Sequence, residues 1–271
     1  MGRVAQDGSG RRRRVTTPIE ATPSTPAPQH TGRQHTAPQH TGTATDEVPS
    51  GARPTTPPRV LADPQQLATR IRAMLDPRPS AASGRLIIGI TGAPGAGKST
   101  IAQDLVAAYG PGAALVCMDG FHLAQQVLDQ LGTTEIKGAP ETFDAQGYLE
   151  LLARLAREPD GTPIYAPEFR RSIEEPIAGA VAVPPSARVI ITEGNYLLLD
   201  TPPWDRVRSL VAEIWYLDTP EPLRLNRLID RHVDFGRTAQ AARERAVSGS
   251  DGRNAALVLA SRDRADLILQ P

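Results

Sequence analysis

Residues 92–99 read Gly-Ala-Pro-Gly-Ala-Gly-Lys-Ser, and they match the phosphate-loop pattern G-x-x-x-x-G-K-[ST] at every fixed position. A continuous apolar run at residues 86–90 precedes this stretch, and a helical pattern over residues 98–109 follows it. Glycines let the backbone N–H groups come close to phosphate oxygens, and the helix N-terminus adds partial positive charge. The stretch therefore predicts a phosphate-binding loop between a buried strand and a helix.

The expected phosphate-binding residues are Gly92, Ala93, Pro94, Gly95, Ala96, Gly97, Lys98, Ser99 and Thr100. In an ATP site Lys98 would bridge the β- and γ-phosphates as a catalytic group, Ser99 would ligate Mg²⁺, and Thr100 would donate to the α-phosphate. The sequence carries neither an Asn-Lys-x-Asp guanine-reading motif nor a Leu-Ser-Gly-Gly signature. The loop therefore favours small-molecule kinases and assorted ATPases over GTPases and ABC-type proteins.

Apolar runs and helical patterns alternate on both sides of this loop. Strands are expected at residues 114–118, 189–191, 214–217 and 267–269, and helices at 67–75, 149–155, 221–234 and 238–247. Strands that alternate with helices indicate an α/β fold with a parallel sheet flanked by helices. Ligands bind beyond the carboxyl ends of such strands, which is where Asp119 and Glu193 fall.

The overall composition limits the function classes. The 271 residues carry 30 basic and 30 acidic side chains. This zero net charge argues against a dedicated nucleic-acid binder, which usually carries an excess of basic residues. One cysteine, Cys117, excludes an intrachain disulfide. No run approaches the ~18 apolar residues of a membrane span, and no secretion signal precedes the domain. We expect a cytoplasmic protein that does not associate with a membrane.

Residues 1–60 differ from the rest of the chain. They hold nine of the 26 prolines, no aromatic residue and two copies of Pro-Gln-His-Thr-Gly. Such a segment buries too little apolar surface to offset its ordering entropy. We therefore expect a disordered N-terminal tail over 1–60 and one globular domain over 61–271.

Asp119 and His122 follow the strand expected at 114–118. A carboxylate there could accept the proton of an attacking hydroxyl or hold a water on Mg²⁺; the alternative is a helix cap. Lys137 lies in a Gly- and Pro-containing loop that ends at Asp144, which is a second candidate helix cap. His122 and Lys137 are candidate substrate contacts.

A Pro-rich stretch around Tyr165 and Arg170 is expected to form a hairpin or flap over the site. Glu193 ends the next strand, where an acid can support Mg²⁺ through water. Asn195 and Tyr196 follow it and could face the acceptor. Tyr165, Arg170, Asn195 and Tyr196 thus join the candidate substrate contacts.

Arg224, Arg227 and Arg231 lie on one face of the helix expected at 221–234. Arginines on a lid could clamp a transferring phosphoryl group. The alternative is a surface helix whose arginines pair with Asp230 and Asp234. We expect a lid.

The order of these motifs resembles the P-loop kinase superfamily of uridine kinase, phosphoribulokinase and bacterial type I pantothenate kinase. The resemblance covers roughly 85–271 and rests on the loop at 92–99, Met118-Asp119-Gly120-Phe121, Lys137-Gly138-x-Pro140-Glu141-x-x-Asp144, the segment around Tyr165, and Glu193-Gly194-Asn195. It is nearest to a bacterial nucleoside/nucleotide kinase-like family that includes kinases linked to fructose transport.

The resemblance implies a P-loop fold with a lid, ATP and Mg²⁺ as cofactors, and a small-molecule acceptor, with a homodimer as a candidate assembly. It implies Asp119 as catalytic base, Glu193 as support for the metal, and Arg227 and Arg231 as lid residues. The flap reads Tyr-Ala-Pro rather than the Tyr-Ser-His of pantothenate kinases, and residues 138–144 differ from the His-Pro-Asp-Ala-Phe-Asp of uridine kinases. The acceptor therefore stays open between a nucleoside, a pantothenate-like compound and a sugar.

The function expected from the sequence is transfer of the γ-phosphate of ATP to an alcohol group of a small molecule. A P-loop ATPase coupled to a protein partner, such as a transporter, is the alternative.

Overall fold

The computed structural model describes residues 56–76, 84–157 and 160–271, all of which belong to one compact unit. Its centre is a six-stranded sheet in the order β1-β8-β7-β2-β6-β3, in which every neighbouring pair is parallel. The strands are β1 Arg59–Leu61, β2 Leu86–Thr91, β3 Ala113–Cys117, β6 Val189–Glu193, β7 Glu213–Leu217 and β8 Leu267–Gln270.

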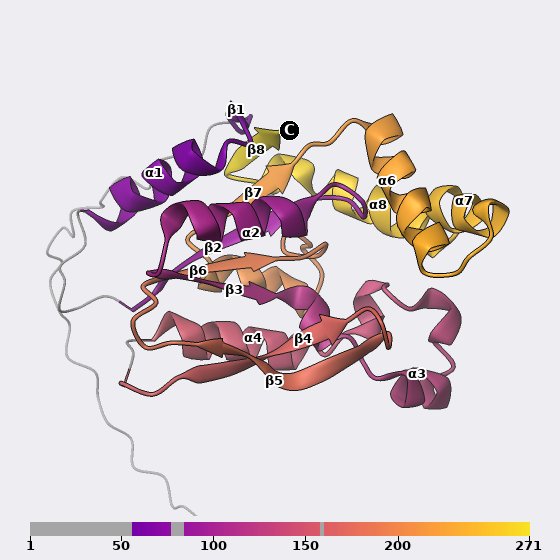
Figure 1. Cartoon of the computed structure of the whole chain (residues 1–271), viewed down its shortest axis with the longest axis horizontal. Coiled ribbons are helices and arrows are strands. Elements are labelled where there is room, and N and C mark those ends of the chain that lie inside the picture. The colour runs from indigo at the N-terminus through magenta and orange to yellow at the C-terminus, as the bar shows by residue number, and fades with distance from the viewer. Residues whose placement is uncertain (1–55, 77–83, 158–159) are drawn as a thin grey trace, which may run out of the picture. The chain divides into compact units, whose positions relative to one another are not determined.

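Helices cover both faces of this sheet (Figure 1). One face packs against α1 (Pro64–Leu75) and α2 (Lys98–Tyr109), and the other packs against α4 (Ala145–Ala156) and the short α5 (Val207–Leu210). The helices α6 (Glu221–Asp234), α7 (Ala239–Val247) and α8 (Ser250–Ala260) follow β7, and α3 (Gln125–Leu131) follows β3. The predicted fold, a parallel sheet flanked by helices, is confirmed.

The core consists of two apolar layers, one on each side of the sheet. Along β2, Ile87 faces the layer under α4, whereas Leu86 and Ile88 face the layer under α1 and α2. All six residues of β2 are buried because helices cover both of its faces. This burial explains why the strand reads as a continuous apolar run rather than an alternating one.

A separate antiparallel hairpin, β4 (Ile164–Arg170) and β5 (Glu175–Val183), lies below the sheet in Figure 1. The expected flap is therefore present as a two-stranded hairpin. Its register shifts between Ala166 and Glu168. The carbonyl of Pro167 in that shift closely approaches Gly120, where an added Cβ would lie 2.4 Å from the Pro167 oxygen. Gly120 thus lets the hairpin pack directly on the turn after β3.

Four helices and strands lie outside the sequence prediction: β1, α3, α5 and α8. β1 pairs with β8 through Arg59 and Ile268, so the sheet includes residues on both sides of the expected boundary at residue 60. The remainder of the expected tail, residues 1–55, lies outside the described residues. Within the part of the chain that the structure describes, no helix is long and apolar enough to cross a bilayer.

Candidate active site at the carboxyl edge of the sheet

The loop between β2 and α2 is built around glycines in left-handed conformations. Gly95 has φ +83° and Gly97 has φ +98°, a region that favours glycine. A Cβ on Gly95 would also lie 2.6 Å from the Arg224 carbonyl oxygen on α6. Backbone conformation and close packing against α6 therefore both require glycine at position 95.

Lys98 begins α2 and is buried. Its Nζ donates to the carbonyl oxygens of Gly92 at 2.9 Å and Ala93 at 3.3 Å. Burial lowers the pKa of the Lys98 ammonium, and the nearby carboxylates of Glu193 and Asp119 partly oppose this shift. The loop thus curls around a buried cation that makes no ion pair with any described residue, an arrangement suited to an anion such as phosphate.

Glu193 lies at the end of β6, in register with Ile90 of β2 and Cys117 of β3. Ser99 Oγ donates to Glu193 Oε1 at 3.0 Å. Burial raises the pKa of the Glu193 carboxyl, and the nearby Asp119 raises it further. A hydroxyl and a carboxylate side by side are the hard oxygen ligands that Mg²⁺ prefers.

Asp119 lies in a 3₁₀ turn, Met118–Phe121, directly after β3. Its Oδ2 lies 3.3 Å from Nη2 of Arg171, which comes from the turn of the hairpin. Burial alone would raise the pKa of the Asp119 carboxyl, but His122, Arg171 and Lys98 hold it below its ordinary value. The carboxylate is therefore ionised at neutral pH and close to the loop lysine.

His122 lies between two aromatic rings. Its ring centroid is 4.0 Å from that of Phe143 and 4.5 Å from that of Phe169 on β4. Nδ1 lies 2.8 Å from the Asp119 carbonyl oxygen, which can only accept, so Nδ1 carries a hydrogen. Burial lowers the pKa of His122, so the ring is neutral near pH 7 and its Nε2 can accept a hydrogen bond.

Lys137 closes the hairpin onto the loop after α3. Its Nζ donates to the Glu174 carbonyl oxygen at 2.7 Å and to Gln125 Oε1 at 3.1 Å. The backbone N–H of Gln125 also donates to the hairpin: it lies 3.1 Å from Oε1 and 3.2 Å from Oε2 of Glu175. In the structure Lys137 therefore fastens the flap that carries Arg171.

Several expected substrate contacts occupy other places. Tyr165 is 58% exposed on the outer side of β4, and Arg170 is exposed at the end of that strand. Tyr196 is fully buried, packs against Phe143, and donates to the Gly138 carbonyl oxygen. Asn195 accepts from Thr91 Oγ1 through its backbone carbonyl at 2.9 Å. The structure brings His122, Asp119, Lys98, Ser99 and Glu193 together, but not Tyr165 or Arg170.

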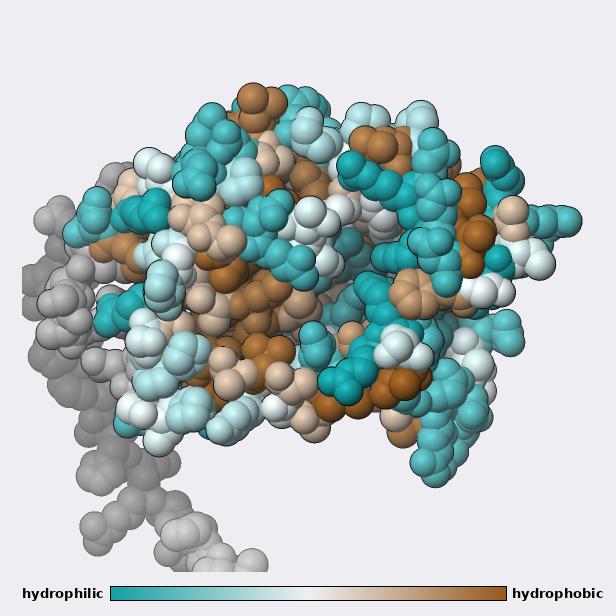
Figure 2. Space-filling view, in the orientation of Figure 1, coloured by the Kyte–Doolittle hydropathy of each residue, from teal (hydrophilic) through white to brown (hydrophobic). Residues whose placement is uncertain are grey.

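The arginines of α6 line the outside of the phosphate loop. Arg224 Nη1 donates to the Pro94 carbonyl oxygen at 3.1 Å, and Arg227 Nη1 donates to the Ala96 carbonyl oxygen at 3.4 Å. Arg231 lies one turn beyond Arg227 and forms no hydrogen bond or ion pair with any residue in the described ranges. Many hydrophilic residues lie on the right of the surface view, over α6 and α7 (Figure 2).

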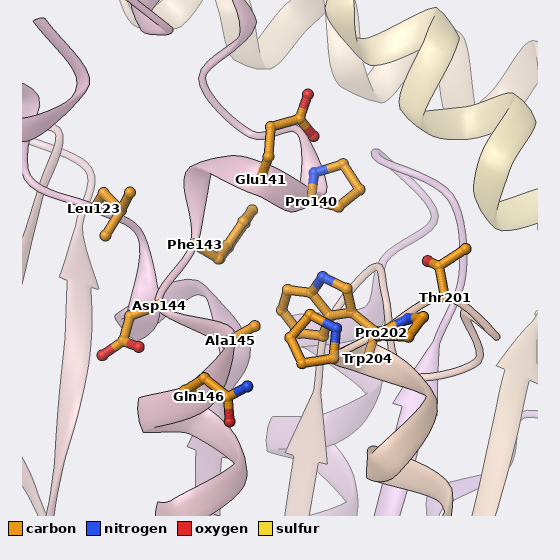
Figure 3. A pocket seen from close by; sticks show the side chains of 11 residues that line it. Leu123, Pro140, Glu141, Phe143, Asp144, Ala145, Gln146, Thr201, Pro202 and Trp204 are labelled. Atoms are coloured by element: carbon orange, nitrogen blue, oxygen red, sulfur yellow. The ribbon is translucent and has the colours of Figure 1, made fainter. Parts of the chain in front are cut away.

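A pocket of about 580 Å³ lies on the other side of Phe143 (Figure 3). Its walls include Leu123, Pro140, Phe143, Pro202 and Trp204. The four phenylalanines of the chain lie in different environments: Phe143 and Phe169 flank His122, whereas Phe121 packs against Tyr148 in the core and Phe235 is 53% exposed.

Sequence reasoning missed Arg171, the residue that contacts Asp119, and chose its neighbour Arg170 instead. It also missed the support from α8, where Asn254 Nδ2 donates to the Gly138 carbonyl oxygen at 3.0 Å. The adjacent Arg-Arg pair was visible in the sequence, but only the folded hairpin, in which β4 ends at Arg170 and Arg171 lies in the turn, decides which of the two reaches Asp119.

A sequence model of the phosphoribulokinase/uridine kinase family matches residues 87–271. A protein of Schizosaccharomyces pombe named "Putative uridine kinase" is 34% identical over 176 residues, which span 62% of this chain and 74% of that protein. The "ATP-dependent kinase-like protein notR'" of Aspergillus versicolor is 35% identical over 152 residues, or 54% of this chain and 88% of that protein.

Two solved structures share the fold. The "putative fructose transport system kinase" from Silicibacter sp. TM1040 superposes with a TM-score of 0.69 at 39% identity, covering 76% of this chain and 98% of that one. YFH7 from Saccharomyces cerevisiae, described as "a putative P-loop containing kinase with a circular permutation", has a TM-score of 0.67 at 20% identity, covering 77% of this chain and 98% of that one. The second likeness shows the fold alone.

Proposed function

The chain belongs to the phosphoribulokinase/uridine kinase family, and we propose that it transfers the γ-phosphate of ATP to a hydroxyl group of a small molecule. The observation that carries this proposal is the placement of Asp119. The Asp119 carboxylate is ionised and lies beyond the end of β3. It is close enough to the buried Lys98 for each group to shift the pKa of the other. A general base beside a phosphate loop is what transfer to an alcohol requires.

The residues around the loop fit ATP with Mg²⁺. Lys98 carries a buried positive charge without a carboxylate in ion-pair distance, and the loop and the start of α2 surround it with backbone dipoles. Within the described ranges no group of three or more His, Cys, Asp or Glu side chains is arranged for a metal. Ser99 and Glu193 would therefore hold Mg²⁺ together with phosphate oxygens and water, which is its usual mode of binding.

Bound Mg²⁺ supplies charge neutralisation on the phosphates, and the residues of the chain supply the rest. Asp119 accepts the proton of the acceptor hydroxyl through its carboxylate. His122, fixed between two aromatic rings with Nδ1 on the Asp119 carbonyl, offers Nε2 to orient that hydroxyl. Lys98 stabilises charge on the oxygens of the transferred group.

We further propose that the enzyme works in the cytoplasm on an acceptor such as a nucleoside, a pantothenate-like compound or a sugar, with a homodimer as the assembly to test first. The tail and the domain at 61–271 are proposed to act independently.

The test is ATP turnover by the full chain with Mg²⁺, with and without nucleosides, pantothenate and sugars. Stimulation by one acceptor, with a phosphorylated product detected by mass spectrometry, supports the kinase. Turnover that no acceptor stimulates, but that a protein partner does, favours the coupled ATPase. Lys98→Met is the control for contaminating kinases, because it removes the cation while keeping the length of the side chain.

A further inference from the structure

The backbone of Lys137 and Gly138 is held by side chains from helices that come much later in the sequence. Arg245 Nη2 on α7 donates to the Lys137 carbonyl oxygen at 3.1 Å, and Asn254 Nδ2 on α8 donates to the Gly138 carbonyl oxygen at 3.0 Å. The Gly138 carbonyl also accepts from the Tyr196 hydroxyl, after β6. Two helices and the sheet therefore meet at this one turn of the loop.

The burial of Asn254 shows that its contact with the loop is more than incidental. Its side chain lies inside α8 packing, with only 3% of the residue exposed. A buried amide costs free energy unless it is hydrogen-bonded. An apolar side chain would dock α8 without that cost, as Val258 does one turn later. The bond to Gly138 therefore explains why an amide occupies position 254.

The same helices are connected to the phosphate loop. Arg224 on α6 donates to the Pro94 carbonyl oxygen at 3.1 Å. His232 Nε2, near the end of α6, lies 2.6 Å from Asp251 Oδ2 on α8, and that oxygen lies 3.5 Å from Arg245 Nε on α7. The helices α6, α7 and α8 lie side by side (Figure 1) and form one connected unit between the phosphate loop and residues 137–138.

On its other side, Lys137 leads to the acceptor half of the site. Its Nζ donates to the Glu174 carbonyl oxygen at 2.7 Å, in the turn of the β4–β5 hairpin. Arg171 in the same turn lies 3.3 Å from the Asp119 carboxylate. A movement of the backbone at residue 137 would therefore move the turn that contacts Asp119.

We infer that Arg245 and Asn254 are positioning residues, through which a nucleotide on the phosphate loop orders the acceptor half of the site before any acceptor binds. The inference rests on the proposed function, since it takes ATP as the ligand of the loop at 92–99. A ligand that binds the docked arrangement of α6–α8 lowers the population of any arrangement in which these helices have moved away. The bonds to Lys137 and Gly138 then persist, and the hairpin turn stays beside Asp119.

The experiment is hydrogen–deuterium exchange, read by mass spectrometry, on the full chain with and without the non-hydrolysable ATP analogue AMP-PNP and Mg²⁺. The test variants are Asn254→Ala and Arg245→Gln; the Arg245 side chain is 23% exposed, so the second variant disturbs the packing less. Arg243→Gln is the matched control, because Arg243 is exposed on the same helix. Val258→Ala weakens the packing of α8 but keeps both hydrogen bonds to the loop. Thermal melts accompany each variant.

In the wild type, the analogue should slow exchange at residues 92–100 and also at 137–144. The Gly138 N–H donates to Thr142 Oγ1 within the loop at 2.9 Å, so this amide exchanges when the loop opens. The slowing at 137–144 should be about 5- to 30-fold, the factor that two hydrogen bonds of ordinary strength supply.

The variants should separate positioning from stability. In Asn254→Ala and Arg245→Gln the slowing at 137–144 should fall to about twofold or less, while the slowing at 92–100 persists. Arg243→Gln should behave as wild type. Val258→Ala should lower the Tm by several degrees and still show the slowing at 137–144.

Three results overturn the inference and leave the kinase proposal intact. The first is slowing in the wild type that does not extend to 137–144. The second is wild-type slowing there in both Asn254→Ala and Arg245→Gln. The third is its loss in Val258→Ala as well, which would show that α8 acts only through stability. If the analogue slows exchange nowhere in the wild type, the proposed use of ATP is contradicted, and the inference with it.

Discussion

Replacing Asp119 by asparagine should lower kcat by about 10²- to 10⁴-fold, the usual contribution of a general base. Asparagine keeps the size and much of the hydrogen bonding of the side chain, but it cannot accept the proton of the hydroxyl. At about 1.36 kcal/mol per tenfold change, this loss corresponds to roughly 2.7–5.5 kcal/mol of activation free energy. The Kd for ATP should change little, because the loop at 92–99 is expected to make most of the phosphate contacts.

The same substitution should have little effect on folding. The Asp119–Arg171 pair spans 3.3 Å, and its side chains are 27% and 41% exposed. Ion pairs of this exposure contribute about 0–1 kcal/mol to the free energy of unfolding. Because the pKa of Asp119 lies below its ordinary value, this contribution is present at neutral pH and is lost as the pH falls through the folded-state pKa. The variant should therefore lose at most about 1 kcal/mol at pH 7.

Asp144→Asn is the matched control. Asp144 Oδ1 accepts from the Gly147 backbone N–H at 2.8 Å at the start of α4, and asparagine caps a helix as well as aspartate does. Steady-state kinetics, ATP titration and thermal melts on both variants separate the two roles. If Asp119→Asn is as silent in kcat as Asp144→Asn, Asp119 is only a structural residue, and the coupled ATPase becomes the better hypothesis.

The remaining predictions concern the loop, the hairpin and the N-terminus. Lys98→Met should abolish phosphoryl transfer in the acceptor assay while circular dichroism stays unchanged; near-normal transfer would contradict the assignment of the phosphate loop. Gly120→Ala should lower the free energy of unfolding by about 1–3 kcal/mol in urea titrations, since the added Cβ lies 2.4 Å from the Pro167 oxygen; a shift below about 0.5 kcal/mol would show that the hairpin moves freely. Deleting residues 1–55 should leave the Tm and kcat nearly unchanged. Deleting residues 1–61 should lower the free energy of unfolding by about 1–2 kcal/mol, because β8 loses its ladder hydrogen bonds to β1. Equal melting temperatures of the two deletion variants would show that β1 adds no stability.

The local pattern of the sequence determined the phosphate loop and the positions of the longer strands along the chain. Left-handed glycines, a buried strand before the loop and a helix after it are properties of consecutive residues, so the stretch 92–99 predicts its own conformation. Apolar runs likewise placed the long strands, because helices bury both faces of a parallel sheet. The position of Asp119 beyond the end of β3 followed from the same rule.

Contacts between distant segments were decided only by the tertiary structure. Which of Arg170 and Arg171 reaches Asp119 depends on where β4 ends in the folded hairpin: Arg170 is the last residue of the strand, and Arg171 lies in the turn. Lys137 was expected to contact substrate, yet it binds the Glu174 carbonyl, 37 residues further along the chain. A backbone carbonyl carries no signature in the sequence, so the folded chain alone determined which side chain would meet it.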